Sequence, residues 1–262
     1  MAENTESGRD GVIFRHIRTA LSPGMLADLH CHNFFELIYV VSGDLAHVVE
    51  GRRYRLGPGS LALVRPSTYH CLQVLSGEPY ERYNILFDPV RHGVPGAERL
   101  PRELEMVDLS GNSILTGLFD RMDVYAQADP ESFQELLRLL LNELCLNLLL
   151  FPPGRQQEEG ALSPLLTRAL DYMNRNLFTI QSVDEVARAL FVSPSYLYSQ
   201  FRSGLHQSPK KYIQDKRLLA AQRMLRAGGK PAAVSRECGF REYTTFYRSY
   251  TALFGHSPSG EK

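Results

Sequence analysis

The stretch SVDEVARALFVSPSYLYSQFR, residues 182–202, decides the fold of the C-terminal part of the chain. Ser182 with Glu185 three residues later forms a capping box, which predicts the start of a short helix. Ser193 followed by Pro194 predicts the start of a second helix, because serine caps helix N-termini and proline needs no amide donor at the first helical position. The expected buried positions are Val186, Ala187, Leu190, Leu197 and Phe201. The stretch therefore predicts a helix-turn-helix unit.

The same pattern returns in PAAVSRECGFREYTTFYRSY, residues 231–250. Here Pro231 starts a short helix, Gly239 ends it and Phe240 fills the corner before the next helix. Between the two units, the sequence predicts one long helix over residues 209–225. The expected buried positions of this part are Tyr212, Leu218, Ala221, Leu225, Phe246 and Tyr250. We expect an all-α domain in which one helix connects two helix-turn-helix units.

Charge is unevenly distributed along the chain, although its formal net value is zero. Residues 1–160 hold 14 Lys+Arg and 22 Asp+Glu, a balance of −8. Residues 161–262 hold 15 and 7, a balance of +8. This asymmetry predicts that the second part binds a polyanion, with double-stranded DNA as the partner. A small helical bundle with a solvated basic face is the alternative.

The outward side chains of the two second helices suit a DNA groove. Short polar, aromatic and Arg side chains can pair with base edges in the major groove, and Lys or Arg can neutralise phosphates. The candidates on the helices are Ser195, Tyr196, Tyr198, Ser199, Arg202, Tyr243, Thr244, Tyr247 and Arg248. The candidates for phosphate contacts are Arg202, Lys210, Lys211 and Arg241. We expect these residues to form the DNA-binding surface.

Residues 164–258 resemble the DNA-binding domain of AraC/XylS-type transcription regulators. The motifs that carry the resemblance are Ser-Pro-Ser-Tyr-Leu at 193–197, Ser208-Pro209, Arg217-Leu218, Cys238-Gly239-Phe240 and Phe254-Gly255-His256-Ser257-Pro258. The resemblance implies that Ser195, Tyr198, Ser199, Tyr243, Thr244 and Arg248 face the bases. It also implies transcription activation and contact with RNA polymerase.

Three positions depart from that family's pattern. His206 stands where glycine is usual, and Ser235 where alanine is usual. The chain ends in Ser-Gly-Glu-Lys instead of a closing Tyr-Arg. The last departure predicts a short final helix.

Residues 11–108 show short apolar runs separated by turn signals. Strands are expected at 34–41, 45–49, 53–56, 60–64, 69–75 and 80–87. Such regular spacing is typical of an antiparallel sandwich or small barrel. We expect a cupin-like β-barrel here, which makes the whole chain α+β.

Two helices are expected after the strands, over 110–126 and 131–151. The second carries leucine on more than one face, so it must be buried on two sides. One side can pack on the barrel and the other on the same helix of a second subunit, which predicts a homodimer. Burial wholly within one subunit is the alternative.

These patterns divide the chain into a tail (1–10), a sensing barrel (11–108), a helical connector for dimerisation (109–151), a linker (152–163) and a DNA-binding domain (164–262). The four scattered cysteines form no CxxC pair and predict reduced thiols. The first ten residues are polar, and charged or amide residues interrupt the most apolar stretch. We expect a cytoplasmic protein that does not engage the membrane.

A polar motif lies in the expected barrel. Gly24-x5-His30-x-His32-x3-Glu36-x6-Gly43 resembles the first cupin motif, and Gly59, Pro66 and His70 partly match the second. On one strand His30, His32 and Glu36 would share a face, and His70 on a facing strand would join them. Three His and one carboxylate suit a divalent metal ion. His16, His47 and His92 fall outside this set and are expected on surfaces or strand faces, without a role.

Three interpretations of His30, His32, Glu36 and His70 remain open: a metal-free pocket for an organic effector such as a sugar, a divalent metal site, or satisfied structural residues. The AraC/XylS resemblance favours the effector pocket and implies no cofactor. We therefore expect a non-enzymatic, DNA-binding transcription regulator that responds to a small-molecule effector. A metal-binding cupin sensor or enzyme fused to a DNA-binding domain is the alternative.

Overall fold

The computed structural model describes residues 11–20, 24, 29–151, 160–161, 163–205 and 207–261. The predicted tail (1–10), residues 152–159 and 162 of the predicted linker, and His206 lie outside these described residues. The chain divides into two compact units. The first comprises Met1–Val49 and Arg53–Gly160, and the second comprises Ala161–Lys262 with Glu50–Arg52.

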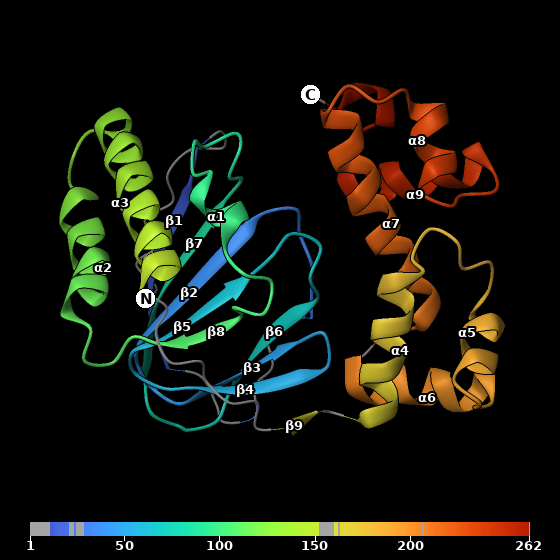
Figure 1. Cartoon of the computed structure of the whole chain (residues 1–262), viewed down its shortest axis with the longest axis horizontal. Coiled ribbons are helices and arrows are strands. Elements are labelled where there is room, and N and C mark those ends of the chain that lie inside the picture. Colours follow the sequence, from blue (N-terminus) through green and yellow to red (C-terminus); the bar gives the residue numbers. More distant parts are fainter. Residues whose placement is uncertain are drawn as a thin grey trace. The chain divides into compact units, whose positions relative to one another are not determined.

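The first unit contains two antiparallel sheets (Figure 1). One has five strands in the order β1-β7-β2-β5-β8, and the other has four in the order β6-β3-β4-β9. The strands are β1 (Ile13–Thr19), β2 (Phe35–Ser42), β3 (Leu45–Val49), β4 (Arg52–Leu56), β5 (Ser60–Val64), β6 (His70–Val74), β7 (Tyr80–Phe87), β8 (Met106–Asp108) and β9 (Gly160–Ala161). The predicted antiparallel β architecture is confirmed.

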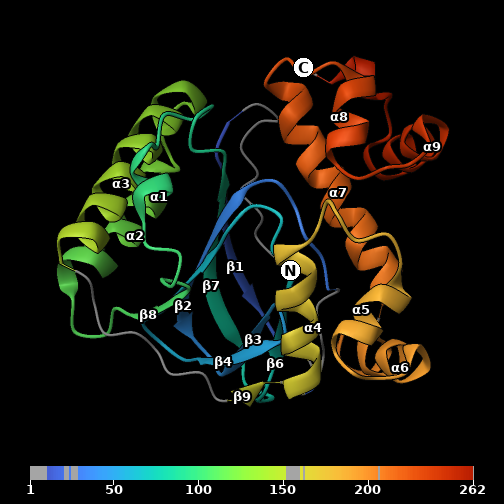
Figure 2. The same ribbon diagram turned by 45° about the vertical axis from the view of Figure 1, so that its right-hand side comes forward.

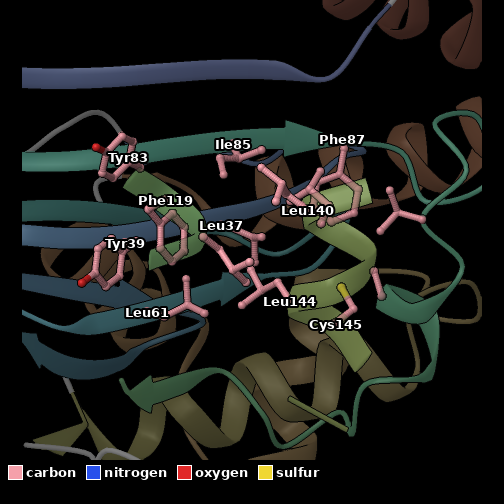
Figure 3. Packing of buried hydrophobic residues seen from close by; sticks show 14 of the residues in the cluster. Leu37, Tyr39, Leu61, Tyr83, Ile85, Phe87, Phe119, Leu140, Leu144 and Cys145 are labelled. Atoms are coloured by element: carbon pink, nitrogen blue, oxygen red, sulfur yellow. The ribbon is translucent and has the colours of Figure 1, made fainter. Parts of the chain in front are cut away.

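Each face of the five-stranded sheet has its own apolar core, because side chains alternate along a strand. One face packs against two helices, α2 (Ser113–Tyr125) and α3 (Pro130–Leu150), as Figures 1 and 3 show. In this core the Tyr39 and Phe119 rings stack with centroids 4.1 Å apart. The other face meets the four-stranded sheet through Ile38, Val40, Ala62, Tyr80 and Met106. The space between the sheets therefore has an apolar end of its own.

The helical connector lies where the sequence predicted it. Helix α3 begins at Pro130 because the side chain of Asp129 accepts a hydrogen bond from the backbone N–H of Ser132 at 3.0 Å. Strands β1 and β8 and the short helix α1 (Gly96–Arg99) have no counterpart among the predicted elements. The described helices include none that is both long and apolar enough to cross a membrane.

The second unit is helical, as predicted. Its helices are α4 (Pro164–Arg175), α5 (Val183–Ala189), α6 (Pro194–Leu205), α7 (Pro209–Arg226), α8 (Pro231–Glu237) and α9 (Tyr243–Phe254), followed by a 3-10 turn at Pro258–Gly260. Figures 1 and 2 show α7 running from the pair α5 and α6 to the pair α8 and α9. The predicted caps form, since the Ser182 and Ser193 hydroxyls accept from the N–H groups of Glu185 and Tyr196, both at 3.2 Å.

Arg217 on α7 ties these helix pairs together. Its guanidinium donates to the carbonyl of Leu177 at 2.8 Å, of Ile180 at 2.6 Å and of Gly239 at 2.9 Å. The first two carbonyls lie in the segment before α5, and the third lies in the turn between α8 and α9. Burial lowers the pKa of Arg217 from its usual value, but an arginine keeps its charge in proteins. One side chain thus fixes both helix-turn-helix units to the connecting helix.

The final helical element is short, as predicted: it is a 3-10 turn of three residues, Pro258–Gly260. Helix α9 spans 12 residues, the same length as α6. It ends at Gly255, whose φ of 76° is a left-handed conformation that glycine adopts freely. Glu261 then accepts hydrogen bonds from Tyr250 and from Arg226 at 2.8 Å. The final carboxylate therefore secures the end of the chain without the Tyr-Arg that the family pattern has there.

Replacing Arg217 with methionine should destabilise the DNA-binding unit by about 2–4 kcal/mol, because three carbonyls lose a charged donor. Hydrogen exchange on the whole chain, compared over residues 163–261, measures this loss. Arg236→Met, an exposed position on α8, should change protection little. Equal losses for the two variants would contradict the role of Arg217.

Candidate DNA interface and sensor site

The residues predicted to bind DNA all lie on the surface of the second unit. Those on α6 are Ser195, Tyr196, Tyr198, Ser199 and Arg202, those on α9 are Tyr243, Thr244, Tyr247 and Arg248, and the remaining three are Lys210, Lys211 and Arg241. The side chains that anchor the two helices, Leu197 and Phe201 on α6 and Phe246 and Tyr250 on α9, are fully buried. The helices thus have the expected inner and outer faces.

The exposed face of α6 is joined to that of α9 by the start of α7. Tyr198, Lys210, Arg241 and Thr245 line one cleft. Lys211 and Arg248 line a second, which Thr245 also borders. The structure therefore brings predicted residues from both helix-turn-helix units onto one continuous surface.

Thr245 is a surface residue that the sequence pattern missed. It is exposed and lines both clefts. Its signal is the spacing of Thr245 and Arg248, because residues three apart share one helix face. Thr245 belongs with the candidate DNA-binding residues.

The basic side chains of this surface differ in their present partners. Lys211 forms an ion pair with Asp215 at 2.7 Å, and Arg241 donates to the side-chain oxygen of Gln181 at 2.9 Å. Within the described residues, Arg202, Lys210 and Arg248 form no ion pair. These three charges are free to meet phosphates or base edges without breaking a contact.

The four predicted sensor residues form one compact cluster in the first unit. His30, His32, Glu36 and His70 each offer a ligand atom, and these atoms lie within 4.8 Å of one another. Glu36 Oε2 lies 2.8 Å from His32 Nε2 and 2.8 Å from His70 Nε2. Burial raises the pKa of Glu36, but hydrogen bonds from His32 and His70 lower it more, so it lies well below its usual range. The carboxylate is therefore ionised at neutral pH.

The backbone segments that hold these four residues differ from the predicted ones. Strand β2 starts at Phe35, so His30 and His32 do not share a strand with Glu36 as expected. Instead, the carbonyl of His32 accepts from the N–H of Ser67 at 2.7 Å, which holds the segment against the turn before β6. His30 pairs with His70 through two backbone hydrogen bonds of 3.0 and 3.1 Å. The prediction that His30, His32 and Glu36 share one strand is therefore wrong, but their side chains and that of His70 do come together.

These residues fit a divalent metal ion. His70 Nδ1 lies 3.0 Å from the carbonyl oxygen of Thr68, which can only accept, so Nδ1 carries the proton. Because Nε2 donates to the Glu36 carboxylate, a metal ion would replace the proton on Nε2. Nδ1 would keep its bond to the carbonyl, which is a common orientation of metal-binding histidines. His30 is exposed and His32 is half-buried, which leaves a path from solvent. His30, His32, Glu36 and His70 would hold the ion, and a bound ion would supply an electrophilic anchor for oxygen atoms of a ligand.

His47 is buried, which corrects the expectation that it lies on a surface without a role. His47 on β3 is 0% exposed, and neither ring nitrogen has a hydrogen-bond partner in the part of the chain that the structure describes. Its ring centroid lies 5.8 Å from that of His70. Burial lowers the pKa of His47 to about 3, so the imidazole is neutral. The signal in the sequence was its alternation with Leu45 and Val49, which share the inner face of β3.

His16 and His92, by contrast, are engaged elsewhere in the first unit. His16 lies between the carboxylates of Glu81 at 2.7 Å and Asp123 at 2.9 Å. His92 Nδ1 accepts from the backbone N–H of Asp88 at 3.0 Å. Neither residue joins the sensor cluster.

Two protein-family models match this chain, one for each of its two units. Residues 22–172 match the AraC-like ligand binding domain, and residues 186–261 match a helix-turn-helix domain. The chain belongs to the AraC family of transcription regulators. Its two units thus correspond to a ligand-binding part and a DNA-binding part.

Curated relatives of this AraC-family chain are transcription regulators. The transcriptional activator RhaR of Enterobacter sp. (strain 638) is 25% identical over 246 residues, covering 87% of this chain and 84% of the relative. The activator RhaS of Klebsiella pneumoniae (strain 342) is 23% identical over 257 residues, covering 87% and 85%. The lactose operon transcription activator of Staphylococcus xylosus is 28% identical over 95 residues, covering 36% and 34%.

Solved structures similar to the chain include ToxT from Vibrio cholerae, with 11% identity, a TM-score of 0.40 and coverage of 95% of this chain and 97% of that one. An AraC-type regulator from Chromobacterium violaceum is 29% identical over 37% of this chain and 88% of its own, with a TM-score of 0.35.

Proposed function

We propose that this AraC-family protein is a cytoplasmic transcription activator that binds double-stranded DNA through α6 and α9 and responds to a small-molecule effector in its first unit. The observation that carries the proposal is the continuous basic surface formed by both helix-turn-helix units. Two relatives named as transcriptional activators, each covering most of the chain, support the sign of regulation. RNA polymerase is the partner that activation requires.

Effector control is proposed to work as a shift between populations. An effector can move an equilibrium only by binding one state more tightly than another. The buried carboxylate of Glu36 and the histidines around it provide polar groups for such an effector. Footprints and DNA affinities with and without effector test the coupling, and identical results would refute it.

Within the DNA surface, Arg248→Ala should weaken specific binding by about 1–3 kcal/mol and relax the choice of base, if the guanidinium pairs with a base edge. Lys210→Ala should instead weaken all sequences alike and reduce the slope of log K against log salt by about 1, because it removes a phosphate contact. Fluorescence anisotropy over a salt series, with operator and random DNA, measures both effects.

Lys230→Ala is the control, since Lys230 lines none of the DNA-facing clefts described above. Unchanged binding by both Arg248→Ala and Lys210→Ala would show that α6 and α9 do not contact DNA in this way.

A homodimer formed through α3 is proposed on the basis of exposed leucines. Leu139, Leu146 and Leu150 are 53%, 45% and 69% exposed, although the opposite face of the helix is buried. Their spacing of seven and four residues places them in one stripe. An apolar stripe on a helix is a surface that a second copy can cover in a two-fold interface.

Leu146→Glu should raise the dimer dissociation constant at least about 100-fold, because two copies of a buried leucine are lost in a two-fold interface. Analytical ultracentrifugation measures this change. Val90→Glu, at a 77% exposed position outside α3, should leave the constant unchanged. A chain that is monomeric before substitution would refute the proposal.

A metal-responsive sensor is the second candidate function, favoured by the orientation of His70 toward the carbonyl of Thr68. In that case the whole chain should bind one Zn²⁺ or Mn²⁺, and His32→Ala should lower the affinity at least tenfold by removing a ligand. Calorimetric titration after treatment with EDTA measures binding. His92→Ala is the control, and a substoichiometric or unaltered affinity would eliminate the metal site.

A further inference from the structure

A second polar cluster lies on the inner faces of the same two sheets, beyond the four sensor residues. Arg82 and Asn84 occupy β7 at the same parity as Tyr80, whose ring belongs to the core between the sheets. His47 occupies β3 between Leu45 and Val49 of that core. All three side chains therefore point into the space between the sheets.

These side chains contain polar atoms that the protein does not satisfy. Both ring nitrogens of His47, Nε of Arg82 and Oδ1 of Asn84 are inaccessible to solvent and have no hydrogen-bond partner among the described residues. His47 is 0% exposed and Asn84 is 7% exposed. An orphaned buried polar group costs about 1–3 kcal/mol, so several together indicate a missing partner.

The positive charge of Arg82 indicates that the missing partner is an anion. Among the described residues, no Asp or Glu lies within ion-pair distance of Arg82. Its guanidinium lies 5.9 Å from the centroid of the Tyr80 ring. Arg82 is half-buried and its Nε is inaccessible to solvent, so an anion between the sheets could form a charge-assisted pair with its guanidinium. Glu36 is not the counter-ion of Arg82, because it stands opposite Leu86. Leu86 lies four residues, or about 13 Å of backbone, further along β7. A neutral ligand would leave the guanidinium uncompensated.

The hydrogen-bonding capacities define the ligand further. Arg82 can only donate, Asn84 Oδ1 can only accept, and neutral His47 does one of each. A carboxylate satisfies Arg82, and a hydroxyl on the neighbouring carbon can donate to Asn84 and accept from His47. We propose that His47, Arg82 and Asn84 form a subsite for the carboxylate and adjacent hydroxyl of a small hydroxy acid, which deepens the proposed function by naming the class of its effector.

The proposed subsite is adjacent to the sensor cluster. His47 is next to His70, with ring centroids 5.8 Å apart, and Glu36 accepts from His70. A hydroxy acid of three to six carbons, held at Arg82, extends along β7 toward this cluster. In the longer acids the distal hydroxyls then lie toward His70, whether or not an ion is bound in the sensor cluster.

Three matched pairs of probes test the proposal: lactate with 1,2-propanediol, glycerate with glycerol, and gluconate with sorbitol. Each pair shares a carbon skeleton and differs in the carboxylate. We expect at least one acid to raise the Tm of the whole chain and to bind at least tenfold more tightly than its alcohol in calorimetry. Equal binding within every pair, or no binding by any acid, would overturn the proposal.

Variants of Arg82 supply a second test, which compares both acid binding and the Tm of the empty protein. Arg82→Met should abolish binding of the acid and leave the Tm of the empty protein equal or higher, because an uncompensated charge is removed. Arg55→Met, which breaks an exposed ion pair with Asp44 in the same unit, should keep the acid affinity. If Arg82→Met lowers the Tm more than Arg55→Met does, Arg82 is a structural residue and the proposal fails.

Operator binding separates this inference from the proposed function. If an acid binds through Arg82 but leaves DNA affinity unchanged, the subsite stands and effector control fails. If a neutral sugar changes DNA affinity equally in the native chain and in Arg82→Met, effector control stands and the subsite fails.

Discussion

The alternation of side chains along the five-stranded sheet is the constraint on which the first unit depends. Each strand presents one set of residues to α2 and α3 and the other set to the facing sheet. On β7, Tyr83, Ile85 and Phe87 belong to the core under the helices, while Arg82 and Asn84 occupy the opposite parity. The strand that anchors the helices therefore also positions the polar interior.

This arrangement allows a small domain to contain polar groups without losing its core. The face against the helices carries the larger apolar cluster of this unit. The face between the sheets has an apolar end around Ile38 and Tyr80 and a polar end around Glu36 and His70. Such polar groups are stable only where each finds a partner. Glu36 has two within the protein, whereas His47 has none within the described residues.

The second unit relies on hydrogen bonds as well as apolar packing. Its helices are short, and isolated helices of that length are marginally stable in water. Apolar anchors such as Phe201 and Phe246 fix each helix pair internally. Arg217 then fixes both pairs to α7 through three backbone carbonyls. This arrangement holds α6 and α9 on one surface and leaves their outward residues exposed.

The sequence by itself determined the fold class, the inner and outer faces of α6 and α9, and the set His30, His32, Glu36 and His70. These features follow from local rules, because caps, proline positions and periodicity act over a few residues. Only the tertiary structure decided that His30 and His32 lie off the strand of Glu36, that Glu261 secures the final turn, and that His47, Arg82 and Asn84 point into the same space between the sheets. Those features depend on which strands and helices pack together and on which polar atoms find partners, and neither is encoded in spacing along the chain.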